Sequence, residues 1–131
     1  MAAIPPAADL VVVGAGTAEL AEAVARELGA PLRRAKVERF PDGEVHVVLG
    51  EPVRGERCIL VQSLCAPVGE RLLELALLAD ACHRAGAAAL VGVLPYLGYA
   101  RQDRSTLTGE ALGGAVMARL VSSCGYARIV A

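Results

Sequence analysis

The sequence contains little of what several common kinds of functional site require. Its 131 residues include no tryptophan, one phenylalanine, three tyrosines and two histidines. No two of the four cysteines have the CxxC spacing typical of a zinc site, and the histidines are too few to complete one. A chain this rich in apolar residues also needs no disulfide framework. We interpret the cysteines as reduced, buried thiols of a cytoplasmic protein; they are Cys58, Cys65, Cys82 and Cys124.

The sequence also lacks an excess of charge of either sign and an unbroken apolar span. The formal net charge is −1, so the overall field favours neither nucleic acid nor an acidic membrane surface. The longest uncharged stretch, residues 85–100, is interrupted by three glycines and Pro95 and is typical of a strand with its connections. No basic region precedes Asp9, the first charged residue, which argues against a signal peptide. We expect no nucleic-acid or membrane partner and a cytoplasmic location.

What the sequence does contain is an alternation of short apolar runs with helical stretches. Hydrophobic residues make up 55% of the chain, which is enough for the core of one domain. Residues 10–13 form a continuous apolar run, typical of a central parallel strand. The alternation predicts a three-layer α/β domain with a mainly parallel central sheet. Strands are expected at residues 10–13, 37–39, 45–49, 58–61, 88–93 and 128–131, and helices at 18–28, 70–84 and 110–123.

The first predicted helix is amphipathic. Thr17 can cap it, and Glu22 and Arg26 have the i,i+4 spacing of a surface ion pair. The residues expected on its buried stripe are Leu20, Val24 and Leu28.

Residues 37–49 have the pattern of a small β-ribbon. Pro41-Asp42-Gly43 is a turn signal. After the turn, Val45, Val47 and Leu49 fall on one face of a strand. We expect a half-exposed ribbon that projects from the main sheet.

The loop after the predicted strand 88–93 is the first candidate site. Ligands of open α/β sheets bind at the carboxyl ends of the strands. Arg101 and Arg104 can present planar donors to phosphate oxygens. Gln102 adds an amide, and Asp103 could orient an arginine. These residue types predict a phosphorylated ligand, and the alternative is a solvated turn with an internal ion pair.

The ribbon turn is the second candidate site. Phe40, the only phenylalanine, can stack on a base, and the carboxylates of Asp42 and Glu44 can accept hydrogen bonds from an exocyclic amine. The alternative, which the chemistry alone favours, is that Phe40 plugs the core. A dinucleotide motif beginning at Gly14 is not predicted, because Glu19 stands where its third glycine is required.

Taken together, these segments resemble the ribose-phosphate pyrophosphokinase family in their order and spacing. The run Leu94-Pro95-Tyr96-Leu97-Gly98-Tyr99-Ala100-Arg101-Gln102-Asp103-Arg104 is highly specific. The other matching stretches are individually weak but collinear: Arg39-Phe40-Pro41-Asp42-Gly43-Glu44, Glu51-Pro52-Val53-Arg54-Gly55, Val61-Gln62-Ser63 and Leu73-Glu74-Leu75.

The resemblance implies a type I phosphoribosyltransferase-like fold and transfer of pyrophosphate from ATP to ribose 5-phosphate, with Mg²⁺, to form PRPP. It implies homo-oligomers, as dimers within hexamers. Adenine contacts from the neighbouring subunit are implied for Phe40, Asp42 and Glu44. Contacts to ATP within the subunit, with the arginine on the phosphates, are implied for Arg101, Gln102 and Asp103.

Two departures from the family pattern limit these expectations. The chain ends at Ala131, before the family's metal-binding histidine and catalytic loops. Residues 1–131 are therefore predicted to be an N-terminal domain with no catalytic residue or metal ligand of its own, inactive alone. Arg54 matches one arginine of the family's regulatory anion site, but a second arginine is missing from the stretch beginning at Gly109. The alternatives are a non-catalytic relative that regulates by co-assembly and a stand-alone nucleotide-binding domain.

Overall fold

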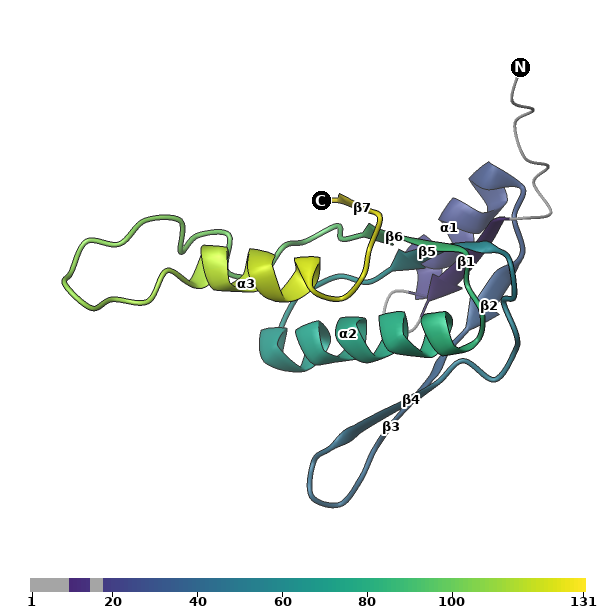
Figure 1. Cartoon of the computed structure of the whole chain (residues 1–131), viewed down its shortest axis with the longest axis horizontal. Coiled ribbons are helices and arrows are strands. Elements are labelled where there is room, and N and C mark those ends of the chain that lie inside the picture. The colour runs from purple at the N-terminus through teal and green to yellow at the C-terminus, as the bar shows by residue number, and fades with distance from the viewer. Residues whose placement is uncertain (1–9, 15–17) are drawn as a thin grey trace.

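A five-stranded parallel sheet forms the middle layer of the molecule (Figure 1). The computed structural model describes residues 10–14 and 18–131. From one edge to the other, the strands are β2 (Leu32–Arg34), β1 (Leu10–Gly14), β5 (Arg57–Val61), β6 (Ala89–Val93) and β7 (Arg128–Val130). Every neighbouring pair is parallel. The predicted parallel sheet is thus confirmed, while the short edge strand β2 was not predicted.

Helices cover both faces of this sheet, as the three-layer prediction required. Successive strand residues point to opposite faces, so Val12 packs with α1 (Ala18–Leu28) whereas Val13 packs with α2 (Val68–Arg84). The α2 side of the core also contains Cys58, Leu60, Leu78, Cys82 and Leu90. A third cluster joins α2 to α3 (Gly113–Ser122); its buried members are Leu64, Leu75, Leu94, Met117 and Val121.

The helix α1 follows its predicted stripe only in part, because Leu20 and Val24 are partly buried against the core whereas Leu28 is not. Its most buried residues are Ala21 and Ala25, whereas Leu28 is 43% exposed. The alanines let the helix approach the sheet closely, which leaves the larger side chains to the flanks. Glu22 forms an ion pair with Arg34 of the neighbouring β2, in place of the predicted pair with Arg26. Thr17, the predicted cap, lies outside the described residues.

The predicted ribbon consists of β3 (Lys36–Arg39) and β4 (Val45–Val48), which pair antiparallel and extend away from the sheet (Figure 1). The side chains of β4 alternate as predicted: His46 and Val48 are exposed, while Val47 and Leu49 pack against the α2 side of the core. Apolar packing therefore anchors only the base of the ribbon.

Two further findings concern the apolar residues and cysteines. Cys58 and Cys82 are buried as predicted, but Cys124 is only partly buried and Cys65 is exposed, because it follows β5 in a loop. The helix α2 is covered on two sides by the sheet and the ribbon, yet Leu73 remains 49% exposed. Among the described residues, no helix is both long and apolar enough to cross a membrane.

The end of β1 depends on a residue without a side chain. A Cβ added at Gly14 would lie 2.6 Å from the Cβ of Ala21. We expect Gly14→Ala to lower the free energy of unfolding by about 1–3 kcal/mol, because the helix has to shift away from the strand. At Gly69 in α2 an added Cβ meets no atom within 4 Å, so Gly69→Ala is the matched control, with a gain of at most about 0.5–1 kcal/mol. Urea unfolding of both variants checks this, and equal stability would show that α1 does not approach β1 this closely.

Candidate functional site

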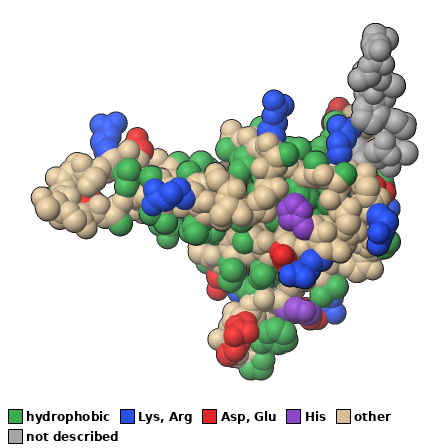
Figure 2. Space-filling view, viewed as in Figure 1, with side chains coloured by type: hydrophobic (Ala, Val, Ile, Leu, Met, Phe, Trp, Pro, Cys, Tyr) green, Lys and Arg blue, Asp and Glu red, His purple; other side chains and the backbone are tan. Residues whose placement is uncertain are grey.

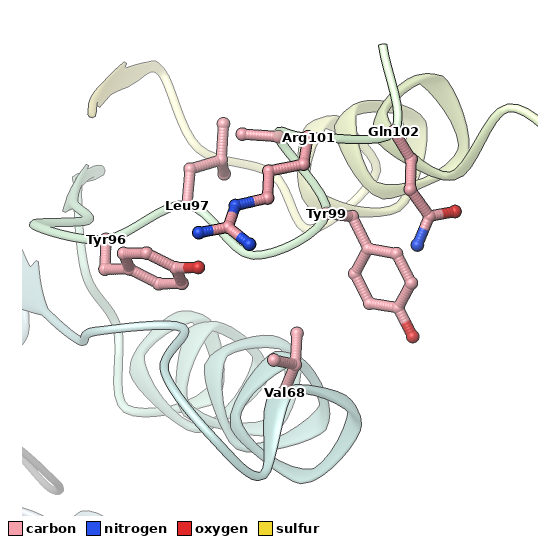
Figure 3. Close-up of a pocket in the computed structure, with 7 residues that line it drawn as sticks. Val68, Tyr96, Leu97, Tyr99, Arg101 and Gln102 are labelled. Atoms are coloured by element: carbon pink, nitrogen blue, oxygen red, sulfur yellow. The ribbon is translucent and has the colours of Figure 1, made fainter. Parts of the chain in front are cut away.

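A hollow of about 430 Å³ lies at the carboxyl edge of the parallel sheet (Figure 3). The loop after β6 forms most of its wall, and the first residue of α2 closes one side. Its lining residues are Val68, Tyr96, Leu97, Tyr99, Ala100, Arg101 and Gln102. The predicted site residues Arg101 and Gln102 thus line a concave surface at the edge where α/β proteins bind ligands. The lining residues Tyr96 and Tyr99 were not predicted as site residues.

The arginine side chains of this loop have different surroundings. The guanidinium of Arg101 extends into the hollow between Tyr96 and Tyr99 (Figure 3), and no ion pair of Arg101 is found among the described residues. The Nε atom of Arg104 lies 3.6 Å from a carboxylate oxygen of Asp103, with both side chains mostly exposed. An exposed pair of this kind contributes little stability. Arg101 is therefore the cation directed at the hollow, while Asp103 lies beside Arg104.

The inner part of the loop is held against the start of α3. Tyr99 has a φ of 65°, a left-handed conformation that is unusual for a residue with a bulky side chain. It allows the Gln102 N–H to donate to the Tyr99 carbonyl at 2.9 Å. The Gln102 carbonyl in turn accepts from the Gly114 N–H at 2.9 Å. A Cβ at Gly114 would lie 2.9 Å from this same carbonyl oxygen, so the close approach of the two backbones favours glycine there.

The outer part of the loop is held by Glu110. One of its carboxylate oxygens accepts from the N–H groups of Thr106 and Leu107, at 2.9 and 3.0 Å, and lies 3.2 Å from the Thr106 hydroxyl. These hydrogen bonds favour the ionised form and hold the pKa of Glu110 below its ordinary value.

The second candidate site lies at the tip of the ribbon. Phe40 is 47% exposed, so the alternative that it plugs the core is wrong. Its ring centroid lies 5.3 Å from that of His46. The Glu44 N–H donates to Asp42 Oδ1 at 2.9 Å, which orders the turn. Figure 2 shows acidic and hydrophobic side chains together at this end of the ribbon. An aromatic ring and two carboxylates are thus presented to solvent.

One chain does not bring the two candidate sites together. The ribbon and the loop after β6 extend from the body in different directions (Figure 1), and no ribbon residue lines the hollow. Arg54 directly precedes β5 and so lies at the amino ends of the parallel strands, opposite the hollow at their carboxyl ends. Gly86 packs against the backbone of Arg54. The stretch beginning at Gly109 belongs to the loop after β6, so a single chain does not unite Arg54 with it.

The structure also reveals a buried charge that sequence reasoning missed. The Glu74 side chain is 4% exposed and lies among arginine and glutamine side chains of other segments. Hydrogen bonds from Arg71 to Glu74, together with the charge of this carboxylate, raise the pKa of Arg71. The only sequence signal was a glutamate inside an apolar helix.

Comparison with known proteins identifies the family. A family model described as the N-terminal domain of ribose phosphate pyrophosphokinase matches residues 10–125. This chain belongs to that family. It is 42% identical over 118 residues to ribose-phosphate pyrophosphokinase 1 of Spinacia oleracea, covering 90% of the chain and 35% of that relative. It is 41% identical over 122 residues to the ribose-phosphate pyrophosphokinase of Ralstonia nicotianae, covering 92% and 39%.

A solved structure agrees with the family assignment. The phosphoribosylpyrophosphate synthetase from Mycobacterium smegmatis superposes with a TM-score of 0.81 and 33% identity, covering 91% of this chain and 41% of that chain. The predicted fold and family are therefore confirmed. This chain spans little more than a third of the length of these two curated relatives.

The order of the loop after β6 is expected to depend on pH through Glu110. Because the folded pKa is lowered, the contribution of the carboxylate to loop order is complete above the pKa of the unfolded chain and is lost as the pH falls through the lower folded value. The amide NMR signals of Thr106 and Leu107 should titrate with a midpoint below the ordinary pKa of a glutamate side chain. Glu110→Gln should remove this step and Glu27→Gln, on α1, should retain it. A step that survives in Glu110→Gln would mean that another group holds the loop.

Proposed function

We propose that this chain forms the ATP-binding part of a ribose-phosphate pyrophosphokinase, which transfers the β,γ-pyrophosphoryl group of ATP to the 1-hydroxyl of ribose 5-phosphate and so forms PRPP. The observation that carries the proposal is the position of Arg101. Its guanidinium extends into a hollow at the carboxyl edge of a parallel sheet, and no carboxylate pairs with it among the described residues. The family membership of the chain supports the same function.

The chemistry of the hollow suits a triphosphate. Transfer of a phosphoryl or pyrophosphoryl group depends on positioning and on stabilisation of charge more than on covalent chemistry by the protein. The planar guanidinium of Arg101 offers two parallel donors to phosphate oxygens. Gln102 offers an amide at the same wall. Asp103, next in the chain, completes the predicted contacts to ATP within one subunit.

The chemistry of the ribbon tip suits adenine. Phe40 offers an exposed aromatic face on which a base can stack. One oxygen of Asp42 orders the turn, which leaves its other oxygen and the Glu44 carboxylate to accept from the adenine amine. Because the ribbon extends away from the hollow of its own chain, the adenine that it holds belongs to ATP bound by a second copy. The proposal therefore requires a homo-oligomer, with dimers as the smallest unit and hexamers expected for the whole enzyme.

The described residues do not fit a protein-held metal. No group of three or more histidine, cysteine, aspartate or glutamate side chains among them could hold an ion. In this proposal Mg²⁺ enters with the phosphates of ATP. The ribose 5-phosphate site and the transfer step belong to the part of the relatives that this chain does not span, so the 131 residues alone are inactive. The four free thiols suit the reducing cytoplasm, where we place the enzyme.

The proposal predicts that the chain binds ATP and that both predicted sites contribute. Phe40→Ala and Arg101→Ala should each weaken ATP binding about tenfold, since stacking on a base and a charge-assisted contact to phosphate are each worth about 1–3 kcal/mol. Isothermal calorimetry at a fixed protein concentration measures this. The matched controls are Leu28→Ala and Arg26→Ala, both on α1, which should bind as the unaltered chain does.

Mixing the two variants tests whether the site is shared. In a dimer that contains one Phe40→Ala chain and one Arg101→Ala chain, two sites are shared between the chains. One of them combines the unaltered Phe40 of the second chain with the unaltered Arg101 of the first. The mixture should therefore recover tight ATP binding in a fraction of its sites, which neither variant shows alone. If the unaltered chain binds no ATP, or if the double variant Phe40→Ala/Arg101→Ala binds it equally well, the proposed function is wrong for this chain. If mixing restores nothing, the sites are not shared between copies.

A further inference from the structure

Glu74 carries the most buried charged side chain in the described part of the molecule, and the proposed contacts to ATP do not include it. Glu74 lies in the second turn of α2, next to the fully buried Leu75, and its side chain is 4% exposed. An ionised carboxylate is expensive to bury unless it is paired and hydrogen-bonded. The identity and origin of its partners therefore show what the buried charge holds together.

The partners of Glu74 come from three separate segments. Nη1 of Arg71, one turn earlier in α2, lies 3.1 and 3.0 Å from the two carboxylate oxygens. Nε2 of Gln62, which directly follows β5, donates to the carboxylate at 3.0 Å. Nη2 of Arg39, the last residue of β3, lies 3.3 Å away. The carboxylate thus links the helix, the edge of the sheet and the ribbon.

Arg39 is held at two points. The same Nη2 atom also lies 2.8 Å from Oε2 of Glu70, which precedes Glu74 by one helical turn. Two carboxylates on one face of α2 therefore bind one guanidinium of the ribbon. Arg39 pairs with Val45 across the ribbon and directly precedes Phe40 in the chain. The ion pairs of this guanidinium thus hold the ribbon directly beside its tip.

These ion pairs give the ribbon a defined direction, which its apolar contacts alone do not. The ribbon strands pair only with each other and not with the five-stranded sheet. The strand β4 lies against α2, and Val47 and Leu49 pack the base of the ribbon on the core. Apolar contact is non-directional, whereas charge-assisted hydrogen bonds to a planar guanidinium impose a defined geometry.

We propose that Glu74 is a positioning residue of the nucleotide site: acting through Arg39, it fixes the direction in which the β3–β4 ribbon leaves the domain, and so where Phe40 meets the base. The link from Glu74 to the direction of the ribbon stands on the geometry alone, and the link to the base rests on the proposed function. The helix α2 is the common reference, because Val68 at its start lines the hollow while Glu70 and Glu74 hold the ribbon.

The first test measures the ribbon without any nucleotide. In ¹⁵N-labelled chain, Glu74→Gln and Arg39→Gln should both lower the NMR order parameters of the amides in residues 36–48 and change their residual dipolar couplings. The amides of β1, β5 and β6 should keep their values. The double variant Arg39→Gln/Glu74→Gln should match Arg39→Gln alone, because Arg39→Gln already removes the guanidinium that both Glu70 and Glu74 bind. Asp80→Asn removes an exposed carboxylate of α2 that pairs with Arg84, and as the control it should leave the ribbon unchanged.

The second test separates the base from the phosphates. ATP engages both candidate sites, whereas inorganic tripolyphosphate can engage only the hollow. In Glu74→Gln and Arg39→Gln the affinity for ATP should fall about tenfold, the contribution of one stacked base, while the affinity for tripolyphosphate should stay the same. A loss of general stability would weaken both probes equally. Calorimetry at matched protein concentrations measures the two affinities.

The outcomes decide the matter even if one variant fails to fold. Arg39→Gln leaves the buried Glu74 carboxylate paired with Arg71 and Gln62. This variant should therefore fold, and it can test the proposal without Glu74→Gln. Unchanged ribbon couplings in Arg39→Gln would overturn the proposal, as would equal losses for ATP and tripolyphosphate. A ribbon that loosens without any loss of ATP affinity would overturn the positioning role. If the unaltered chain binds no ATP, the proposed function fails, and the ribbon couplings alone decide whether Glu74 sets its direction.

Discussion

The shared direction of the five strands is the constraint on which the rest of this structure depends. Because the strands are parallel, the loops after β5 and β6 leave at the same edge, and α2 must return across one face between them. This return, together with α1 on the other face, buries strand side chains such as Val12 and Val13 completely. With both faces covered, the concave surface forms at the carboxyl edge, where the first residue of α2 meets the loop after β6.

The two predicted contacts to the nucleotide are held to this framework in different ways. The loop with Arg101 is held through its backbone, by the hydrogen bonds of Gln102 and by the absence of a side chain at Gly114. The ribbon with Phe40 shares no backbone pairing with the sheet, and side-chain ion pairs join it to α2. A backbone contact persists through most side-chain changes, whereas an ion pair is lost when either side chain is replaced. The direction of the ribbon is therefore the more adjustable of the two.

Much of the fold could be predicted from local patterns. The apolar run at residues 10–13 and the alternation from Val45 to Leu49 each report burial along a single strand, and both predictions are confirmed. The segment β2 escaped prediction because it is an edge strand of three residues, two of them arginines. Leu28 was assigned to the buried side of α1 because periodicity identifies an apolar stripe. The part of that stripe that meets the sheet depends on how closely the helix approaches it.

The sequence by itself determined the family, the parallel α/β framework and the residue types offered to a nucleotide, because these follow from local order and spacing. Only the tertiary structure decided that Phe40 is exposed, that Arg101 rather than Arg104 extends into the hollow, and that Glu74 is buried. Each of these depends on groups that are distant in the chain. The partners of Glu74 include Gln62 and Arg39, 12 and 35 residues away, and a buried charge is tolerated only where folding brings such partners within hydrogen-bonding distance.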